Sequence, residues 1–329
     1  MKTLYVSQSD CYVSLRKEFL LVKRQDRILA EVQLPFLEQV LIFGKAQVTT
    51  QAIHACLSRN IPILYLSRMG FCYGRIIAIE RGYRHLSRYQ QELGWQQRLI
   101  TARTIVAAKI KNARVFLQRQ HRKHPTPSLQ LAIDGLKHFV ELTVKADKLE
   151  QLLGYEGTAA NLYFQAWADC IENSNFIFFG RSRRPPGNPV NAMLSFGYQV
   201  LWNHLLTLIE LQGLDPYQAC LHQGSERHAA LASDLIEEFR VPIVDSLVLY
   251  MINRRLIDVG EDFVFQNGGC FLNSSGRRKW LGAFVGRMEE FLSFDQGDFP
   301  RWHCLIDQVK KYKAFIYSPS NSYSPFLIR

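Results

Sequence analysis

The chain has 329 residues, of which 47% are hydrophobic, and its 40 Lys and Arg exceed its 29 Asp and Glu by 11 charges. This composition supports one or two buried cores and excludes intrinsic disorder, and 20 Gly with 12 Pro exclude a collagen-like or low-complexity fibre. No apolar run approaches the roughly 20 residues of a membrane helix, and no apolar block follows Lys2, so we expect neither a membrane segment nor a signal peptide. The positive charge favours a polyanionic partner, most often nucleic acid; solubility alone is the alternative explanation.

The seven cysteines are scattered along the chain, and no two are spaced as Cys-x-x-Cys. A zinc ribbon or a thioredoxin-like redox pair therefore lacks its usual spacing. An odd, scattered set is typical of a reducing compartment, so we expect a cytoplasmic protein in which most thiols are small buried hydrophobic groups.

The chain up to about residue 80 has the pattern of short β-strands, rich in β-branched and aromatic residues. A short helix is expected after Thr49 and Thr50, ending near Asn60 in a left-handed conformation with Pro62 just beyond it. The expected strands are 4–6, 12–15, 19–22, 28–32, 40–43, 63–66 and 72–79, with a hairpin turn at 24–27.

After about residue 85 the hydrophobic period becomes that of helices, with few strand signals. The sequence therefore predicts an α+β protein, with a small N-terminal β-domain at 1–85 and a larger all-α domain at 86–329. The expected helices are 87–122, 127–145, 147–173, 189–211, 226–240, 243–256 and 277–293.

Two helix starts carry clear capping signals. We expect Asn188 to be an N-cap with Pro189 as the first helical residue, because proline is pre-organised for that position. Ser225 is expected to cap a helix that begins at Glu226. The polar segment after Tyr312 is expected to fray.

The first candidate for chemistry is Glu156, which lies in the middle of an apolar helical stripe. Burying an unpaired carboxylate is costly, so Glu156 requires a cation, a metal ion or a proton if it faces the core. The alternative is a rotated stripe that leaves Glu156 at its edge in solvent. The stripe consists of Leu149, Leu152, Leu153, Ala160, Tyr163 and Trp167, at spacings of three and four.

A second candidate set contains one imidazole and nearby carboxylates. Asp234 and Glu237 lie three residues apart on the expected helix 226–240, and His222 lies in the connection just before it. Such a set suits a hard divalent ion, Mg²⁺ or Mn²⁺, and the imidazole favours Mn²⁺. The alternative is a solvated helix face, with His222 an ordinary loop residue.

Clusters of basic residues form the third feature. Between Thr101 and His124 there are several Lys and Arg but no Asp or Glu, and apolar residues supply a buried side. This pattern predicts a helix with a basic outer face that suits phosphate groups, although any one such cluster is usually a solvated surface. The residues predicted to contact DNA are Lys109, Lys111, Arg114, Arg183, Arg184, Arg254 and Arg255.

Several segments, in chain order, resemble motifs of one known family, the CRISPR-associated spacer-acquisition integrases and endonucleases (the first-numbered Cas protein). The resemblance covers nearly the whole chain. The segments are Lys-Ile-Lys-Asn-Ala-Arg at 109–114, Leu-Gly-Tyr-Glu-Gly-Thr-Ala-Ala at 153–160, Pro-Pro-Gly-Asn-Pro-Val-Asn-Ala-Met-Leu at 185–194, Gly-Leu-Asp-Pro-Tyr at 213–217 with Leu-His at 221–222, and Asp-Leu-Ile-Glu-Glu-Phe-Arg at 234–240 with Pro242 and Asp245.

The resemblance implies roles for both domains. Residues 1–85 would form a homodimer, and 86–329 would be the catalytic, metal-binding and DNA-binding domain. The family's metal ligands fall on Glu156, His222 and Glu237, which would then be the catalytic residues with Mg²⁺ or Mn²⁺ as cofactor. Asp234 falls where some members carry an additional acidic residue near the metal.

The resemblance further implies a metal-dependent DNA endonuclease and integrase of CRISPR adaptation. It would insert foreign DNA fragments as new spacers into the CRISPR array, by attack of a fragment's 3′-hydroxyl on a phosphodiester at the repeat boundary. Its partners would be double-stranded and branched DNA, a second copy of the chain and the small second-numbered Cas protein, with no membrane. Two alternatives remain: a structure-specific nuclease acting on branched DNA in repair, and a non-catalytic nucleic-acid-binding scaffold.

Overall fold

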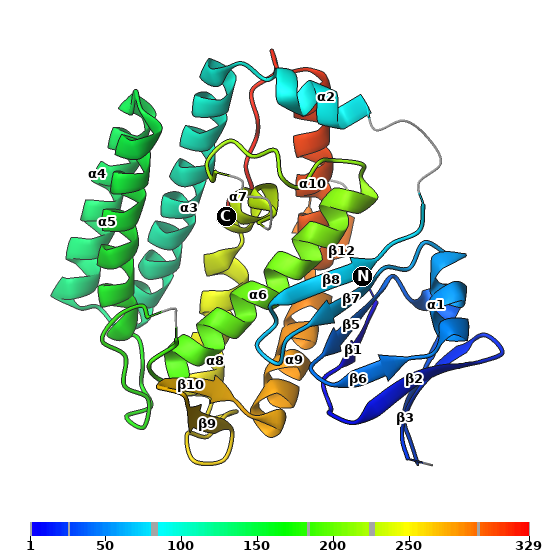
Figure 1. The fold of residues 1–329 in the computed structure, drawn as a ribbon. Helices are drawn as coiled ribbons and strands as arrows, with labels where there is room; N and C mark the ends of the chain where they lie inside the picture. The colour runs from blue at the N-terminus through cyan, green and yellow to red at the C-terminus, as the bar shows by residue number, and fades with distance from the viewer. Residues whose placement is uncertain are drawn as a thin grey trace. The chain divides into compact units, whose positions relative to one another are not determined.

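The computed structural model describes residues 2–25, 27–79, 85–182, 185–223, 228–294 and 297–328. The chain divides into two compact units, Met1–Tyr83 with Asn273–Arg278 and Arg84–Leu272 with Lys279–Arg329. The first contains β-sheets and the second is mostly helical, so the predicted α+β fold class is confirmed (Figure 1). In the described part of the chain, no helix has the length and apolar character needed to cross a membrane.

The first unit contains two four-stranded sheets. One has the order β1 (Thr3–Val6), β5 (Gln39–Phe43), β7 (Ile63–Leu66) and β8 (Cys72–Ile76), and only β8 is antiparallel to its neighbour. The other has the order β4 (Arg27–Gln33), β3 (Phe19–Arg24), β2 (Cys11–Arg16) and β6 (Ala46–Val48). The strand β5 is buried at every residue, as expected of a parallel strand with neighbours on both sides.

Most local expectations for this unit are confirmed. Thr49 caps α1 (Thr50–Leu57), accepting a hydrogen bond from Ala52 N at 3.3 Å, and Asn60 has a φ of +56°. The last predicted strand was too long, because β8 ends at Ile76. The short strand β6 was not predicted.

The second unit is built on long helices. Three of them, α3, α4 and α5, pack side by side (Figure 1), and α6 is buried around nearly its whole circumference. Asn188 caps α6 as expected, accepting a hydrogen bond from Asn191 N at 2.8 Å. The helices after the first unit's strands are α2 (His85–Glu92), α3 (Trp95–Lys123), α4 (Pro127–Lys145), α5 (Leu149–Ala168), α6 (Pro189–Leu211), α7 (Ala230–Ile236), α8 (Ser246–Asn253), α9 (Ser274–Glu289) and α10 (Trp302–Tyr317). The start of α9, as far as Arg278, belongs to the first unit.

Several predicted helix limits were wrong. The expected helix 87–122 is interrupted after Glu92, because Gly94 takes the extended N-cap position of α3. The expected helix 147–173 ends at Ala168. Within the described residues, the expected helix 226–240 is reduced to α7, followed by a π-helical segment, Arg240–Asp245. Its proline cannot donate an intrahelical hydrogen bond, which favours such a wider turn. Ser225 and Glu226 lie outside the described residues.

Three further elements of the second unit were missed. Two are hairpins, β9 (Phe263–Gln266) with β10 (Gly269–Leu272) and β11 (Phe291–Phe294) with β12 (Gly297–Pro300), so this unit is mostly rather than entirely helical. The third is α10, which continues past Tyr312. The expectation that the chain frays after Tyr312 was wrong, because Tyr323 is only 4% exposed and is hydrogen-bonded inside the unit.

Candidate active site

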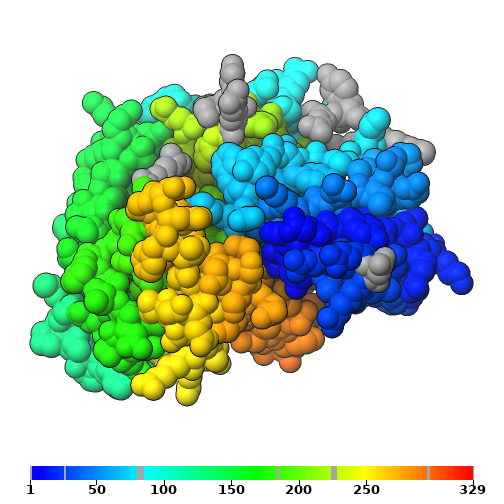
Figure 2. Space-filling model, turned by 60° about the horizontal axis from the view of Figure 1, so that its bottom comes forward, coloured from blue at the N-terminus to red at the C-terminus, as the bar shows by residue number. Residues whose placement is uncertain are grey.

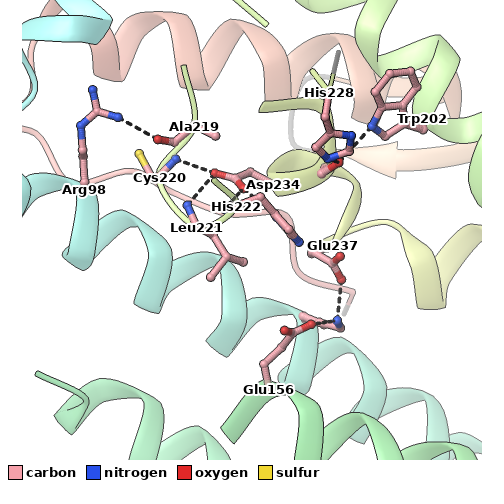
Figure 3. Close-up of polar contacts among 12 residues, drawn as sticks. Arg98, Glu156, Trp202, Ala219, Cys220, Leu221, His222, His228, Asp234 and Glu237 are labelled. Atoms are coloured by element: carbon pink, nitrogen blue, oxygen red, sulfur yellow. Dashed lines mark hydrogen bonds and ion pairs between the residues drawn. The ribbon is translucent and has the colours of Figure 1, made fainter. Parts of the chain in front are cut away.

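Glu156 lies on α5 and faces α3, where it meets the side chain of Lys109. The Lys109 ammonium forms ion pairs with the carboxylates of both Glu156 and Glu237 (Figure 3). The side chains of Lys109 and Glu156 are only 12% and 16% exposed. In this structure, the cation that Glu156 requires in its apolar stripe is therefore the Lys109 ammonium of α3, which packs against α5.

Glu237 follows directly after the last residue of α7 and is 1% exposed. Its Oε2 lies 2.6 Å from Lys109 Nζ, and its Oε1 lies 3.0 Å from Arg240 Nη2. Burial alone would raise the pKa of Glu237, but the neighbouring cations of Arg240 and Lys109 lower that pKa to about 2. Glu237 is therefore a buried carboxylate that stays ionised because two cations face it.

Asp234 is fully buried and uses both carboxylate oxygens to hold the segment before α7. Its Oδ2 accepts hydrogen bonds from Cys220 N at 2.7 Å and Leu221 N at 2.9 Å. Its Oδ1 lies 2.9 Å from both His222 N and His222 Nδ1. Asp234 thus fixes the backbone and the imidazole of His222 together.

This contact determines which ring nitrogen of His222 is available. Because Nδ1 faces Asp234, Nε2 is left for another partner, and Figure 3 shows the ring lying between Asp234 and Glu237. Burial lowers the pKa of His222, but the hydrogen bond and charge of Asp234, followed by the charges of Glu237 and Glu156, outweigh burial and raise it. His222 therefore lies in the electric field of both glutamates.

The arrangement can be tested for its fit to a metal ion. Among the residues that the structure describes, no three His, Cys, Asp or Glu side chains are close enough together to hold one as they stand. Instead, the carboxylates of Glu156 and Glu237, which come from different parts of the fold, meet at the ammonium of Lys109. Two carboxylates around one cation, with an imidazole fixed by a third carboxylate, form a donor set that suits a divalent ion at the position of that ammonium. The residue types therefore fit such an ion in place of the Lys109 ammonium.

Comparison with known proteins identifies the family. The model for CRISPR associated protein Cas1 matches residues 4–285. The chain belongs to the Cas1 family. The family named from the sequence motifs is therefore confirmed.

Two curated relatives and one solved structure illustrate the match. The CRISPR-associated exonuclease Cas4/endonuclease Cas1 fusion of Geobacter sulfurreducens is 37% identical over 302 residues, which are 87% of this chain and 53% of the fusion. A CRISPR-associated endonuclease Cas1 of Thermus thermophilus is 32% identical over 99% of both chains. A chain of the Cas6-RT-Cas1–Cas2 complex has a TM-score of 0.84 at 26% identity, over 99% of this chain and 36% of that one. The chain thus spans about half of the fusion and nearly all of the Thermus relative.

The residues predicted to contact DNA fall into different environments in this Cas1 chain. Lys109 is engaged by carboxylates, and Arg114 donates from Nε to Ile133 O at 3.2 Å. Lys111, Arg254 and Arg255 are exposed. Arg183 and Arg184 lie outside the described residues. The DNA contacts of this set stay a prediction.

The two exposed arginines follow α8 directly. The neighbouring Asn253 accepts a hydrogen bond from Glu172 N at 3.0 Å, which joins this segment to the chain after α5. Figure 2 shows the green and yellow surfaces of these parts of the second unit next to each other. A basic surface here would therefore adjoin the end of the helix that carries Glu156.

A pocket beside Glu156 and Lys109 is also lined by Tyr163, Tyr198 and Asp245, for which the sequence predicted no chemical role. There Tyr163 and Tyr198 donate hydrogen bonds to the two oxygens of buried Asp245, at 3.0 and 2.5 Å. Burial raises the pKa of Asp245 to about 6, although both tyrosines favour its ionised form. Two signals for this cluster were visible in the sequence: Tyr163 in the apolar stripe and Asp245 beside the last family segment.

The substitution Asp234→Asn is expected to weaken divalent-metal binding by about 10- to 100-fold, the usual effect of losing the partner that orients a ligating histidine. The amide has the size of the carboxylate, but it replaces one accepting oxygen with an NH₂ group. That group cannot accept the backbone hydrogen bonds that Asp234 receives. Isothermal titration with Mn²⁺ would measure the effect. The matched control is Asp169→Asn, which changes the residue that follows α5 and lies outside this cluster. Equal Mn²⁺ affinity in wild type and Asp234→Asn would contradict the role given to Asp234.

Proposed function

We propose that this chain is a divalent-metal-dependent DNA endonuclease and integrase of CRISPR adaptation, with Glu156, His222 and Glu237 as the ligands of the ion. The observation that carries the proposal is the convergence of two carboxylates, from α5 and the end of α7, on one cation beside an oriented imidazole. The relatives described as Cas1 endonucleases support the activity.

Each side chain has a separate task in this proposal. When bound, Mg²⁺ or Mn²⁺ would polarise the scissile phosphate and stabilise the charge that develops on it. Glu156 and Glu237 supply hard oxygen donors, and His222 supplies Nε2 because Asp234 holds Nδ1. The nucleophile is the 3′-hydroxyl of the DNA fragment, or water in hydrolysis, so no protein side chain has to form a covalent bond.

The proposed partners are DNA, a second copy of the chain and Cas2. The solved complex that contains Cas1 and Cas2 supports the last of these. For the dimer we propose the β-domain at 1–85. Its edge strand β4 pairs on one side only, and its Ile28 and Leu29 are 44% and 37% exposed. An exposed apolar edge of this kind is a common pairing surface.

The experiment that tests the function is strand transfer of a labelled DNA fragment into a supercoiled plasmid carrying a CRISPR repeat, with Cas2 present. Glu156→Ala is expected to lower the rate about a thousandfold or more, because loss of a metal ligand removes several kcal/mol of transition-state stabilisation. DNA binding is expected to persist. EDTA should abolish joining by the wild type, and Mn²⁺ or Mg²⁺ should restore it.

Glu150→Ala is the matched control, because Glu150 lies on the same helix but is exposed. Cleavage of branched DNA without joining would support a repair nuclease instead. Salt-dependent DNA binding with neither reaction would support a scaffold. Full activity in Glu156→Ala would show that the catalytic centre is elsewhere.

A further inference from the structure

The chain beyond α10 returns to the end of α7, next to the candidate active site. We call residues 321–328 the strap. Within it, the Tyr323 hydroxyl donates to Glu238 Oε1 at 2.6 Å, and Phe326 N donates to Glu238 Oε2 at 2.6 Å. Glu238 is fully buried, so both oxygens of this carboxylate are satisfied by the strap. The immediate chain neighbour of Glu238 is Glu237.

The strap is also fastened to α3 through Asn112, which is fully buried. Asn112 Nδ2 donates to Glu238 O at 2.8 Å and to Phe326 O at 3.0 Å. Its Oδ1 accepts from Ile328 N at 3.0 Å. One amide side chain thus joins the strap, the end of α7 and α3, and it lies less than one helical turn after Lys109 on α3.

Further contacts fix the strap along its length. The ring of Phe326 stacks on Phe239, with ring centroids 4.9 Å apart and an interplanar angle of 26°. Gln308 of α10 donates to the Tyr323 hydroxyl at 2.6 Å and to Ser324 O at 2.9 Å. Buried hydrogen bonds and a ring stack together give the strap one defined position.

Glu237 depends on this support because its own helix is short. The helix α7 has only seven residues, its N-cap Ala229 has no polar side chain, and Glu237 forms its C-cap. A helix of this length is not stable alone, so packing of its flanks determines where its last residues lie. The strap holds Glu238 and Phe239, the two residues that follow Glu237.

We propose that the strap, with Glu238 and Asn112, is a positioning element that sets where the Glu237 carboxylate lies relative to Glu156 and so controls affinity for the divalent ion. This inference rests on the proposed role of Glu237 as a metal ligand. Tyr323, Glu238 and Asn112 act through Glu237 and do not contact the ion or DNA.

The test measures Mn²⁺ affinity of the whole chain by isothermal titration and by the electron paramagnetic resonance signal of free Mn²⁺, without DNA. Tyr323→Phe keeps the ring but removes one buried hydrogen-bond donor, and is expected to weaken Mn²⁺ binding about three- to tenfold. Deletion of 321–329 is expected to weaken it further. Tyr317→Phe is the matched control, since Tyr317 is 54% exposed, and should leave the affinity unchanged.

A second readout separates positioning from simple stabilisation. In strand transfer, Tyr323→Phe should require more Mn²⁺ for half-maximal rate but reach the wild-type rate at saturation. A synthetic peptide of 321–329, added to the deletion variant, should restore its Mn²⁺ affinity. A lower unfolding temperature with unchanged Mn²⁺ affinity in Tyr323→Phe would overturn the inference. If Glu237→Gln binds Mn²⁺ like the wild type, the proposed function fails instead, so the two failures are distinct.

Discussion

The substitution Glu237→Gln is expected to abolish metal-dependent strand transfer and to lower the free energy of unfolding by about 3 kcal/mol or more. Glutamine keeps the size of the side chain but removes the charge that Lys109 and Arg240 share. Two largely buried cations then face each other without their common anion. Urea unfolding without metal, together with the strand-transfer assay, measures both effects.

The pH dependence of this loss follows from the low pKa of Glu237, about 2 against an ordinary 4.5. A carboxyl group with a depressed pKa contributes stability above its unfolded pKa and loses it as pH falls toward the folded value. The stability difference between wild type and Glu237→Gln should therefore be full near neutral pH and shrink as pH falls from 4.5 toward 2.

Glu172→Gln provides the control, because Glu172 is 63% exposed and pairs only at the surface with His124. Such an exposed pair contributes about 1 kcal/mol at most. Wild-type stability of Glu237→Gln would show that the buried charge network does not form. Normal strand transfer by this variant would exclude Glu237 from the metal site.

The parts of the fold that could be predicted are those decided by neighbouring residues. The cap at Asn188 depends on its own side chain and a nearby backbone N–H, and Asn60 adopts its left-handed conformation within a local turn. The β-strands of the first unit could also be predicted, because the local pattern of their apolar residues matches the continuous core that these residues form.

The wrong predictions concern features decided by distant contacts. The helical period continues through Glu92 and Trp95, but the helix is interrupted at Gly94. The residues on either side of the break bond to a distant segment: Gln90 Nε2 donates to Asp215 O at 3.0 Å, and Arg98 Nη1 donates to Ala219 O at 2.8 Å. The chain after Tyr312 is polar in sequence, but it is ordered because Tyr323 meets a carboxylate 85 positions earlier. No local pattern contains these partners.

The candidate site shows the same division. The residue types and order of Glu156, His222 and Glu237 could be predicted because the segments that contain them resemble the motifs of the family, whereas their spacing alone left a solvent-exposed alternative open. The role of Asp234 could not be predicted, because its distances to the His222 ring and backbone depend on how the intervening chain folds. Lys109 was assigned to DNA for its charge, and only the packing of α3 against α5 brings it to the carboxylates.

The substitution Lys109→Met is expected to lower the free energy of unfolding without metal by as much as Glu237→Gln does. Unlike that loss, this one should be reversed by a divalent ion. Without metal it removes the cation between Glu156 and Glu237. Among the described residues, Glu156 then loses its ion-pair partner and Glu237 keeps Arg240. Breaking a buried ion pair from one side costs about 3–5 kcal/mol, so the variant should unfold at clearly lower urea concentration in EDTA. The apolar methionine fills much of the volume of the lysine, which limits the loss from packing.

Adding Mn²⁺ is expected to reverse this loss. In the wild type the ion has to displace the ammonium, whereas in Lys109→Met it meets two carboxylates without a competing cation. Mn²⁺ should therefore stabilise the variant more than the wild type, by about 1.4 kcal/mol or more at equal concentration, which corresponds to a tenfold tighter affinity. Lys111→Met is the control, because Lys111 lies on the same helix but is exposed, and both its stability and its response to Mn²⁺ should match the wild type. Equal stabilisation of wild type and Lys109→Met by Mn²⁺ would mean that the ion does not bind where Lys109 joins the two carboxylates.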